Sequence, residues 1–358
     1  MNFKKFTQLS KLLRLLKGRI VGGAARNFLL NIQENKEIDI ATPYHPNVAY
    51  NIVKATGINV IPLKLDHGTF LATYEKEKYE ITTLRQDMTS IKNRWAKVLF
   101  TVSWRKDAYR RDFTINALSI KKLNPIKFVD YVNGISDIKA QVLRFVGNPE
   151  ERIVEDYLRI LRLFRFWARC AQPDQIALDA AIKYKKGLIC ISKERIIQEL
   201  YLICVEKGCL KPLEFIYQYN IYPINKPEKI LLQLSPLSRL SLIVDLQDMP
   251  VLKRWKQWQK QLQIIPNNFG EIMRIVHIYG KVLAVDYSIL YLSKYTSIIQ
   301  KITCIPKIPI KPTDLPIKPG ILMGIHYKNL VNWWQKQYPY PSFEDCKSWY
   351  NKEYLNGC

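Results

Sequence analysis

The spacing of hydrophobic and polar residues differs between roughly the first 147 residues and the rest of the chain. The first part mixes the two-residue period of strands with the helical period of three to four residues. It predicts helices over residues 7–17 and 24–33, strands at 20–21 and 37–41, a helix that Pro46 opens and Gly57 closes, and a hairpin of strands 69–74 and 79–84. We therefore expect an α/β head up to about residue 147.

Strand signals fade from Pro149 onward, and helical spacing dominates. One long charged helix is expected over residues 150–170 and another over 192–204. Five prolines between residues 304 and 320 exclude a helix there and favour a semi-rigid extended linker. A last apolar helix is expected around residues 327–336, so most of the second part is predicted to be helical.

Charge is the unusual feature of the composition. The 358 residues include 55 Lys and Arg against 31 Asp and Glu, a net charge of +24, which favours nucleic acid or an anionic membrane surface as partner. No apolar run approaches the roughly 20 residues of a membrane span. An AT-rich genome, which enriches lysine, is an alternative source of the charge and does not exclude RNA binding.

The number and spacing of the cysteines and histidines indicate which cellular compartment and which metal chemistry to expect. Seven cysteines without a C-x-x-C pair, and four histidines without zinc spacing, argue against disulfides or a zinc site. Reduced thiols and a cytoplasmic location are expected. The basic, amphipathic residues 1–19 resemble an organelle transit peptide, but a strand follows at once, so a first structural helix is the preferred interpretation.

Glu37 and Asp39 are two residues apart on a predicted strand and therefore share a face. Neighbouring carboxylates repel each other unless cations lie between them, so the pair suits Mg²⁺. The alternative, a solvated strand edge, is commoner for such a pair alone. The preceding Gly22-Gly23 turn and helix, with Arg26 one turn in, instead favour a phosphate site beside the pair.

Two further groups of polar residues extend this picture. Glu80, in the predicted hairpin, is either a third carboxylate beside the first two or a surface acid. The segment RRDFTINAL holds Arg110, Arg111, Asp112 and Asn116. Arginines clamp phosphates, and Asp and Asn hold sugar hydroxyls. A structural salt bridge within the head is the alternative for this segment.

The segment EDYLRILRLFRF places Asp156 and Arg159 three residues apart, on one face of the predicted helix, with Arg162 and Arg165 continuing the row. Cytosine and adenine present an amino donor beside an unprotonated ring nitrogen, whereas uracil and guanine present the reverse pattern. A carboxylate acceptor beside a guanidinium donor therefore matches C and A and rejects U and G. The alternative is an ordinary helix ion pair.

Taken together, these segments resemble bacterial class II tRNA nucleotidyltransferases, the CCA-adding enzymes that share a family with bacterial poly(A) polymerases. The resemblance covers about residues 18–205 and is faint beyond 210, where only residues 320–334 match. The matching segments, in family order, are GGAARNFLL, EIDIATPYHPN, HGTF, EITTLR, KDAYRRDFTINAL, EDYLRILRLFRF and SKERIIQEL.

This resemblance implies an α+β fold: a polymerase-β-like nucleotidyltransferase head with a mixed sheet at 1–147, a helical neck with base recognition at 148–209, and a helical RNA-binding body and tail at 210–358. It implies Mg²⁺ as cofactor and tRNA, CTP and ATP as partners, and assigns residues 86–105 to a loop that helps switch from CTP to ATP. The implied metal ligands and catalytic residues are Glu37 and Asp39, with Glu80 as a further candidate ligand. The implied nucleotide-binding residues are Gly22, Gly23, Arg26, Arg111, Asp112, Asn116, Glu155, Asp156, Arg159, Arg162 and Arg165.

Two residues depart from the family pattern, which usually has Asp at the positions of Glu37 and Asn27. Glutamate is longer, and Mg²⁺ is strict about geometry. Activity is still expected, because Asp39, Arg111 and the base-reading segment are intact. Poly(A) polymerase activity on general RNA and a weakened RNA-binding relative remain alternatives. The sequence leaves the oligomeric state open, and also whether all of C, C and A are added.

Overall fold

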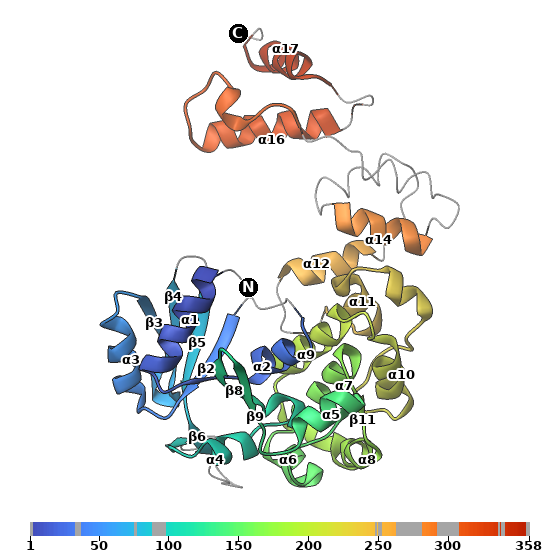
Figure 1. Ribbon diagram of the computed structural model, residues 1–358. Helices are drawn as coiled ribbons and strands as arrows, with labels where there is room; N and C mark the ends of the chain where they lie inside the picture. Colours follow the sequence, from blue (N-terminus) through green and yellow to red (C-terminus); the bar gives the residue numbers. More distant parts are fainter. Residues whose placement is uncertain are drawn as a thin grey trace. The chain divides into compact units, whose positions relative to one another are not determined.

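A computed structural model describes most of the chain (Figure 1). The described residues are 3–32, 37–74, 77–87, 98–247, 249, 253–262, 281–291, 308–335, 337 and 341–355. The chain divides into two compact units, Met1–Tyr222 and Pro223–Cys358. The head and neck expected from the sequence fall together in the first unit, and the finer division into head, neck, body and tail stays a prediction.

A seven-stranded mixed sheet forms the centre of the first unit (Figure 1). Its order is β3-β4-β5-β2-β1-β8-β9, and the β2–β5 pair is parallel while the other pairs are antiparallel. The strands are β1 (Arg19–Val21), β2 (Glu37–Thr42), β3 (Asn59–Lys64), β4 (Thr69–Tyr74), β5 (Glu77–Thr83), β8 (Ser119–Leu123) and β9 (Ile126–Val129). The predicted strands and hairpin are confirmed, and β3, β8 and β9 are additional.

Helices and two small strand pairs complete the head. The helices are α1 (Phe3–Leu15), α2 (Gly22–Leu29), α3 (Pro46–Lys54), α4 (Trp104–Tyr109) and α5 (Gly134–Ala140). The strand pairs are β6 (Arg85–Asp87) with β7 (Val98–Phe100), and β10 (Val142–Leu143) with β11 (Gln172–Pro173).

The leucine stripe predicted for the first helix is buried, since Leu9, Leu12, Leu13 and Leu16 are at most 7% exposed. Each buried leucine stabilises the fold by about 2 kcal/mol. The segment is therefore a structural helix of the head, as expected.

The predicted helix over residues 150–170 is wrong, because it is two helices, α6 (Pro149–Glu155) and α7 (Arg159–Arg169). Asp156 separates them with an extended backbone, φ −153° and ψ 101°. Its carboxylate accepts from the Leu158 amide at 3.1 Å, and its carbonyl accepts from the Arg159 amide at 2.9 Å. This local hydrogen bonding replaces the helical ladder and starts α7 afresh. The first unit continues with α8 (Gln175–Tyr184), a 3-10 segment at Lys185–Cys190, α9 (Lys193–Val205) and α10 (Leu210–Gln218).

The described part of the second unit is helical. It contains α11 (Pro236–Ile243), α12 (Lys253–Leu262), α14 (Lys281–Tyr291), α16 (Ile321–Gln335) and α17 (Phe343–Tyr354). Between residues 308 and 320 the proline-rich segment forms only a short 3-10 turn, Pro312–Asp314, as its prolines require.

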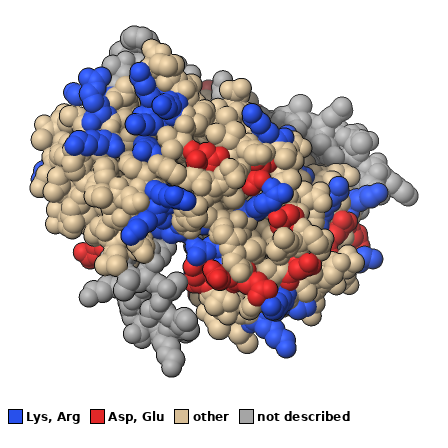
Figure 2. All heavy atoms as spheres, turned by 60° about the horizontal axis from the view of Figure 1, so that its bottom comes forward, with Lys and Arg blue, Asp and Glu red and all other residues tan. Residues whose placement is uncertain are grey.

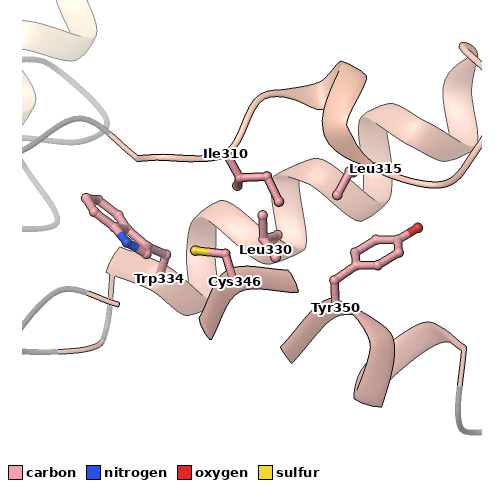
Figure 3. Packing of buried hydrophobic residues seen from close by; sticks show 6 residues of the cluster. All are labelled: Ile310, Leu315, Leu330, Trp334, Cys346 and Tyr350. Carbon is pink, nitrogen blue, oxygen red and sulfur yellow. The ribbon is translucent and has the colours of Figure 1, made fainter. Parts of the chain in front are cut away.

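A separate small core holds α16, α17 and the proline-rich segment together (Figure 3). Ile310 and Leu315 of that segment pack with residues of both helices, and the buried members are Ile310, Leu315, Leu330, Trp334, Cys346 and Tyr350. Trp334 of this core is 1% exposed, and Trp258 of α12 is also buried, at 6%. Among the described residues, no helix is long and apolar enough to cross a membrane.

Candidate nucleotide-binding site

Gly22 lies where β1 ends and α2 begins, and it brings two predicted site residues together. Its φ of +65° is a left-handed conformation that favours glycine. A β-carbon at this position would lie 3.2 Å from Oδ2 of Asp39 and 3.4 Å from Nη1 of Arg111. The helix thus begins at the predicted glycine turn, and its first amide groups start beside an aspartate and an arginine.

The candidate metal ligands lie on the two parallel strands β2 and β5. Asp39 and Glu80 are register partners, so their side chains leave neighbouring strands on the same face. Glu37 lies in β2, but its side chain is outside the described residues. No group of three His, Cys, Asp or Glu suited to a metal occurs in the part of the chain that the structure describes. The arrangement nevertheless fits a cation, because carboxylates share a face and the glycine leaves space beside Asp39.

Arg26 is buried in the head, at 3% exposure. Its Nη1 donates to Oδ1 of Asn116 at 2.5 Å, and its Nη2 donates to Oδ1 of Asn27 at 3.0 Å. Burial lowers the pKa of this guanidinium. A β-carbon on Gly23 would lie 3.5 Å from Nη2 of Arg26, so the guanidinium group of Arg26 lies beside the first turn of α2. Asn27, one of the two departures from the family pattern, is a partner of this buried arginine.

Arg110 and Arg111 share the buried carboxylate of Asp107 in α4. Arg111 lies 3.0 Å from Asp107 and Arg110 lies 2.7 Å from it. Burial raises the pKa of Asp107, but the two guanidinium groups outweigh it and hold the pKa below its ordinary value. Both arginines are therefore held by Asp107, and Arg111 lies next to Gly22.

Asp112 and Asn116 join the head to the helices that follow it. Nδ2 of Asn116 donates to Asp112 at 3.3 Å, and Nε of Arg162 donates to the same carboxylate at 2.8 Å. Arg165 pairs in turn with Glu199 of α9 at 3.0 Å. Burial raises the pKa of Asp112, whereas Arg162 lowers it, and the net shift is downward. The structural salt bridge within the head that the sequence left as an alternative exists between Asp107 and the two arginines Arg110 and Arg111, and Asp112 forms a further one with Arg162 of α7.

The predicted helical face shared by Asp156 and Arg159 is wrong, since Asp156 lies in the break before α7. Arg159 pairs with Glu155 at 2.6 Å, and Asp156 pairs with Arg195 of α9 at 3.2 Å. Nη2 of Arg159 also donates to the carbonyl of Arg110 at 3.4 Å. A turn, rather than a helix face, places the predicted base-reading residues beside the arginine segment.

Sequence reasoning missed three members of this site: Asp107, Arg195 and Glu199. Asp107 precedes Arg110 and Arg111 by three and four residues, and Arg195 precedes Glu199 by four. Both spacings place side chains on one helical face, so they were visible signals. Half of the proposed switching loop at 86–105, residues 88–97, lies outside the described residues.

The mixed sheet, the acid-bearing parallel strands and the glycine turn all lie within residues 18–144, which match the family described as Poly A polymerase head domain. The chain is 41% identical over 210 residues to human CCA tRNA nucleotidyltransferase 1, mitochondrial, covering 57% of this chain and 48% of that protein. It is 36% identical over 208 residues to the CCA-adding enzyme of Oceanobacillus iheyensis, covering 57% and 50%. Residues 18–144 therefore belong to the Poly A polymerase head domain family, and about 210 residues of the chain are similar in sequence to CCA-adding enzymes.

Solved structures agree with this fold. The crystal structure of the Bacillus stearothermophilus CCA-adding enzyme in complex with CTP superposes with a TM-score of 0.66 at 19% identity, covering 93% of this chain and 94% of that chain. A tRNA nucleotidyltransferase complexed with a primer tRNA and an incoming ATP analog gives 0.61 at 21% identity, covering 82% and 96%. At these identities the likeness shows the fold. By sequence, the chain spans about half the length of the curated relatives it matches.

Proposed function

We propose that the protein adds C, C and A to the 3′ end of tRNA, using CTP and ATP and no nucleic-acid template. The observation that supports this proposal is that the candidate metal, phosphate and base contacts lie next to one another. Asp39 and Arg111 meet at Gly22, and the neighbouring Arg110 accepts a hydrogen bond from Arg159. The candidate metal, phosphate and base contacts therefore form one connected surface of the first unit.

The proposed reaction is a nucleotidyl transfer. The 3′ hydroxyl oxygen of the RNA attacks the α-phosphorus, a new P–O bond forms, and the bond to pyrophosphate breaks while the hydroxyl proton leaves to solvent. Asp39, Glu37 and Glu80 would hold Mg²⁺, which would supply charge stabilisation for the attacking and leaving oxygens. Arg111 and the first amides of α2 hold the triphosphate.

Base choice is assigned to the turn between α6 and α7. Asp156 accepts from the exocyclic amino group of cytosine or adenine, and Arg159 donates to the adjacent ring nitrogen. Glu155 orients Arg159 through their 2.6 Å ion pair. Asp112 and Asn116 contact the ribose in this assignment, while Arg162 and Arg165 support the turn from α7.

The surface charge supports a polyanionic substrate. Figure 2 shows one face of the molecule on which Lys and Arg side chains gather to one side, while acidic and basic side chains mix on the other. With the net charge of +24, this surface suits the phosphate backbone of tRNA. The expected cytoplasmic location remains a prediction, since the human, mouse and zebrafish relatives are mitochondrial by name.

The test offers tRNA lacking its 3′ CCA with each labelled nucleotide in a separate reaction. We expect incorporation from CTP, then from ATP once C has been added, and little from UTP or GTP. A long A tail on general RNA would instead support a poly(A) polymerase. RNA binding without any incorporation would support the weakened relative that the Glu37 and Asn27 departures suggest.

The Asp39→Asn variant tests the metal assignment. It keeps the shape of the side chain but removes the charge, so incorporation should fall by at least about a hundredfold while tRNA binding measured by filter retention is unchanged. Glu228→Gln, at an exposed carboxylate of the second unit, is the matched control and should retain full activity. Normal activity of Asp39→Asn would show that the cation is held elsewhere.

A further inference from the structure

The direction of the Asp156 side chain is not set by a helix. Its backbone is extended, and its side chain is 35% exposed at the break between α6 and α7. One carboxylate oxygen accepts from the Leu158 amide, which fixes the local turn. A hydrogen bond to a nucleobase needs a defined carboxylate direction, so tertiary contacts must supply the rest.

The neighbouring residue, Tyr157, lies directly against Gly187 of the 3-10 segment after α8. A β-carbon on Gly187 would lie 2.1 Å from both Cδ1 and Cε1 of the Tyr157 ring, and 2.5 Å from Cγ. Normal carbon contacts are about 3.5–4.0 Å, so the ring would have to move by about 1.5 Å. The φ of Gly187 is not left-handed, so its backbone conformation does not favour glycine. Glycine is required here only because the Tyr157 ring leaves no space for a side chain.

The second support comes from the same stretch of chain. Nη2 of Arg195 donates to Oδ2 of Asp156 at 3.2 Å, and Arg195 follows Gly187 by eight residues. The stretch 187–195 thus holds Asp156 on one side by an ion pair and its neighbour Tyr157 on the other by ring packing. The contact to Gly187 is the less adaptable of the two, because an aromatic ring against backbone cannot rotate away as an exposed arginine can.

We propose that Gly187 is a positioning residue for base selection, which acts by seating the Tyr157 ring and so fixing the direction of the Asp156 carboxylate. This inference rests on the proposed function. A side chain at position 187 displaces Tyr157, and Asp156, joined to it by one peptide bond, moves with it. The acceptor for the amino group of cytosine is then misplaced, and discrimination against uracil is lost.

The test measures equilibrium binding of CTP and UTP to the full-length chain, together with incorporation from each nucleotide. Gly187→Ala should lower the preference for CTP over UTP by about tenfold, the value of one well-placed hydrogen bond. Tyr157→Ala should lower it similarly, whereas Tyr157→Phe, which keeps the ring, should keep the preference. Adding Gly187→Ala to Tyr157→Ala should change nothing further, because no ring remains to displace.

Gly324→Ala is the matched control, since a β-carbon there meets nothing within 4 Å and the backbone is not left-handed. A wild-type preference for CTP in Gly187→Ala, or an equal loss when the substitution is made in Tyr157→Ala, would overturn the proposal. If Gly187→Ala fails to fold, Tyr157→Ala decides, and an unchanged preference there overturns it. Wild-type protein without any preference for CTP would contradict the proposed function itself and the positioning role with it.

Discussion

Asp112 shows how a residue chosen for ligand chemistry also carries structure. Its carboxylate accepts from the Phe113 amide at 2.9 Å, from Asn116 and from Arg162, and its side chain is 9% exposed. A buried carboxylate without partners would be costly, but here every oxygen is satisfied. The same group therefore stabilises the head against α7 and lies within the candidate site.

Asp112 gives a pH prediction with a definite sign. Its folded pKa is depressed, so its contribution to stability is present above the unfolded value of about 3.9 and is lost as pH falls through the folded value. In Asp112→Asn, the loss of unfolding free energy relative to wild type should be largest above about pH 5 and should shrink below it. Urea unfolding at a series of pH values measures this difference.

The control for that series is Glu228→Gln, at an exposed surface position. It should change the free energy of unfolding by less than about 0.5 kcal/mol. A difference between wild type and Asp112→Asn that stays constant down to pH 3 would contradict the ionised, paired carboxylate.

Helix boundaries are set by side chains that compete for the backbone. Asp156 ends α6 and starts α7, which converts one amphipathic stretch into two elements with a turn between them. In the second unit, Asp286 of α14 likewise binds backbone groups at a helix boundary, but the helix is α11, which is distant in the sequence. It accepts from the amide of Ser235 at 2.8 Å and from the hydroxyl of Ser238 at 2.7 Å, and so caps α11. Trp258 of α12 donates to the same Ser238 at 2.9 Å, which joins three helices.

Removing this cap should destabilise the second unit. Asp286 is 2% exposed, and Asp286→Ala leaves a buried amide and two hydroxyl groups with fewer acceptors. We expect a loss of about 2–3 kcal/mol in the free energy of unfolding, measured by denaturant titration with tryptophan fluorescence. Glu228→Ala, from the same unit, should cost less than about 0.5 kcal/mol. Equal effects of the two variants would show that the cap contributes nothing.

At the scale of the whole molecule, charge is the dominant property. The chain carries a net charge of +24, Lys and Arg side chains gather on one side of the face in Figure 2, and a polyanion gains from releasing its counterions at such a surface. In the proposed function, nucleotide binding depends on a few fixed contacts in the first unit, whereas tRNA binding depends on many exposed cations. The two affinities should therefore respond differently to salt.

We expect the logarithm of the tRNA association constant to fall linearly with the logarithm of salt concentration, by about a hundredfold or more between 50 and 200 mM. CTP binding should fall much less over the same range, which makes it the internal control. Filter binding for tRNA and calorimetry for CTP give the two slopes. A tRNA affinity that ignores salt would contradict backbone recognition by the basic surface.

Much of the fold follows from local patterns. The leucines of α1, the alternation in β2 and the turn between β4 and β5 could be predicted from the sequence, because buried residues repeat at the period of each element. The candidate site residues could also be identified from the sequence, since each motif is a short run of unusual polar residues. The spacing of Asp107 to Arg110 and Arg111 was a visible signal, but nothing in the spacing of Arg195 and Glu199 marks their partners in other elements, Asp156 and Arg165.

By itself, the sequence determined several helices and strands of the head, which polar residues are candidates for the chemistry and what kind of partner the charge favours. All of these depend on neighbours within a few residues or on sums over the chain. Tertiary structure alone decided that Arg162 binds Asp112, that Arg195 binds Asp156 and that the Tyr157 ring lies on Gly187. The physical reason is that such pairings join residues 30 to 50 positions apart, where packing of whole elements, not local preference, selects the partner.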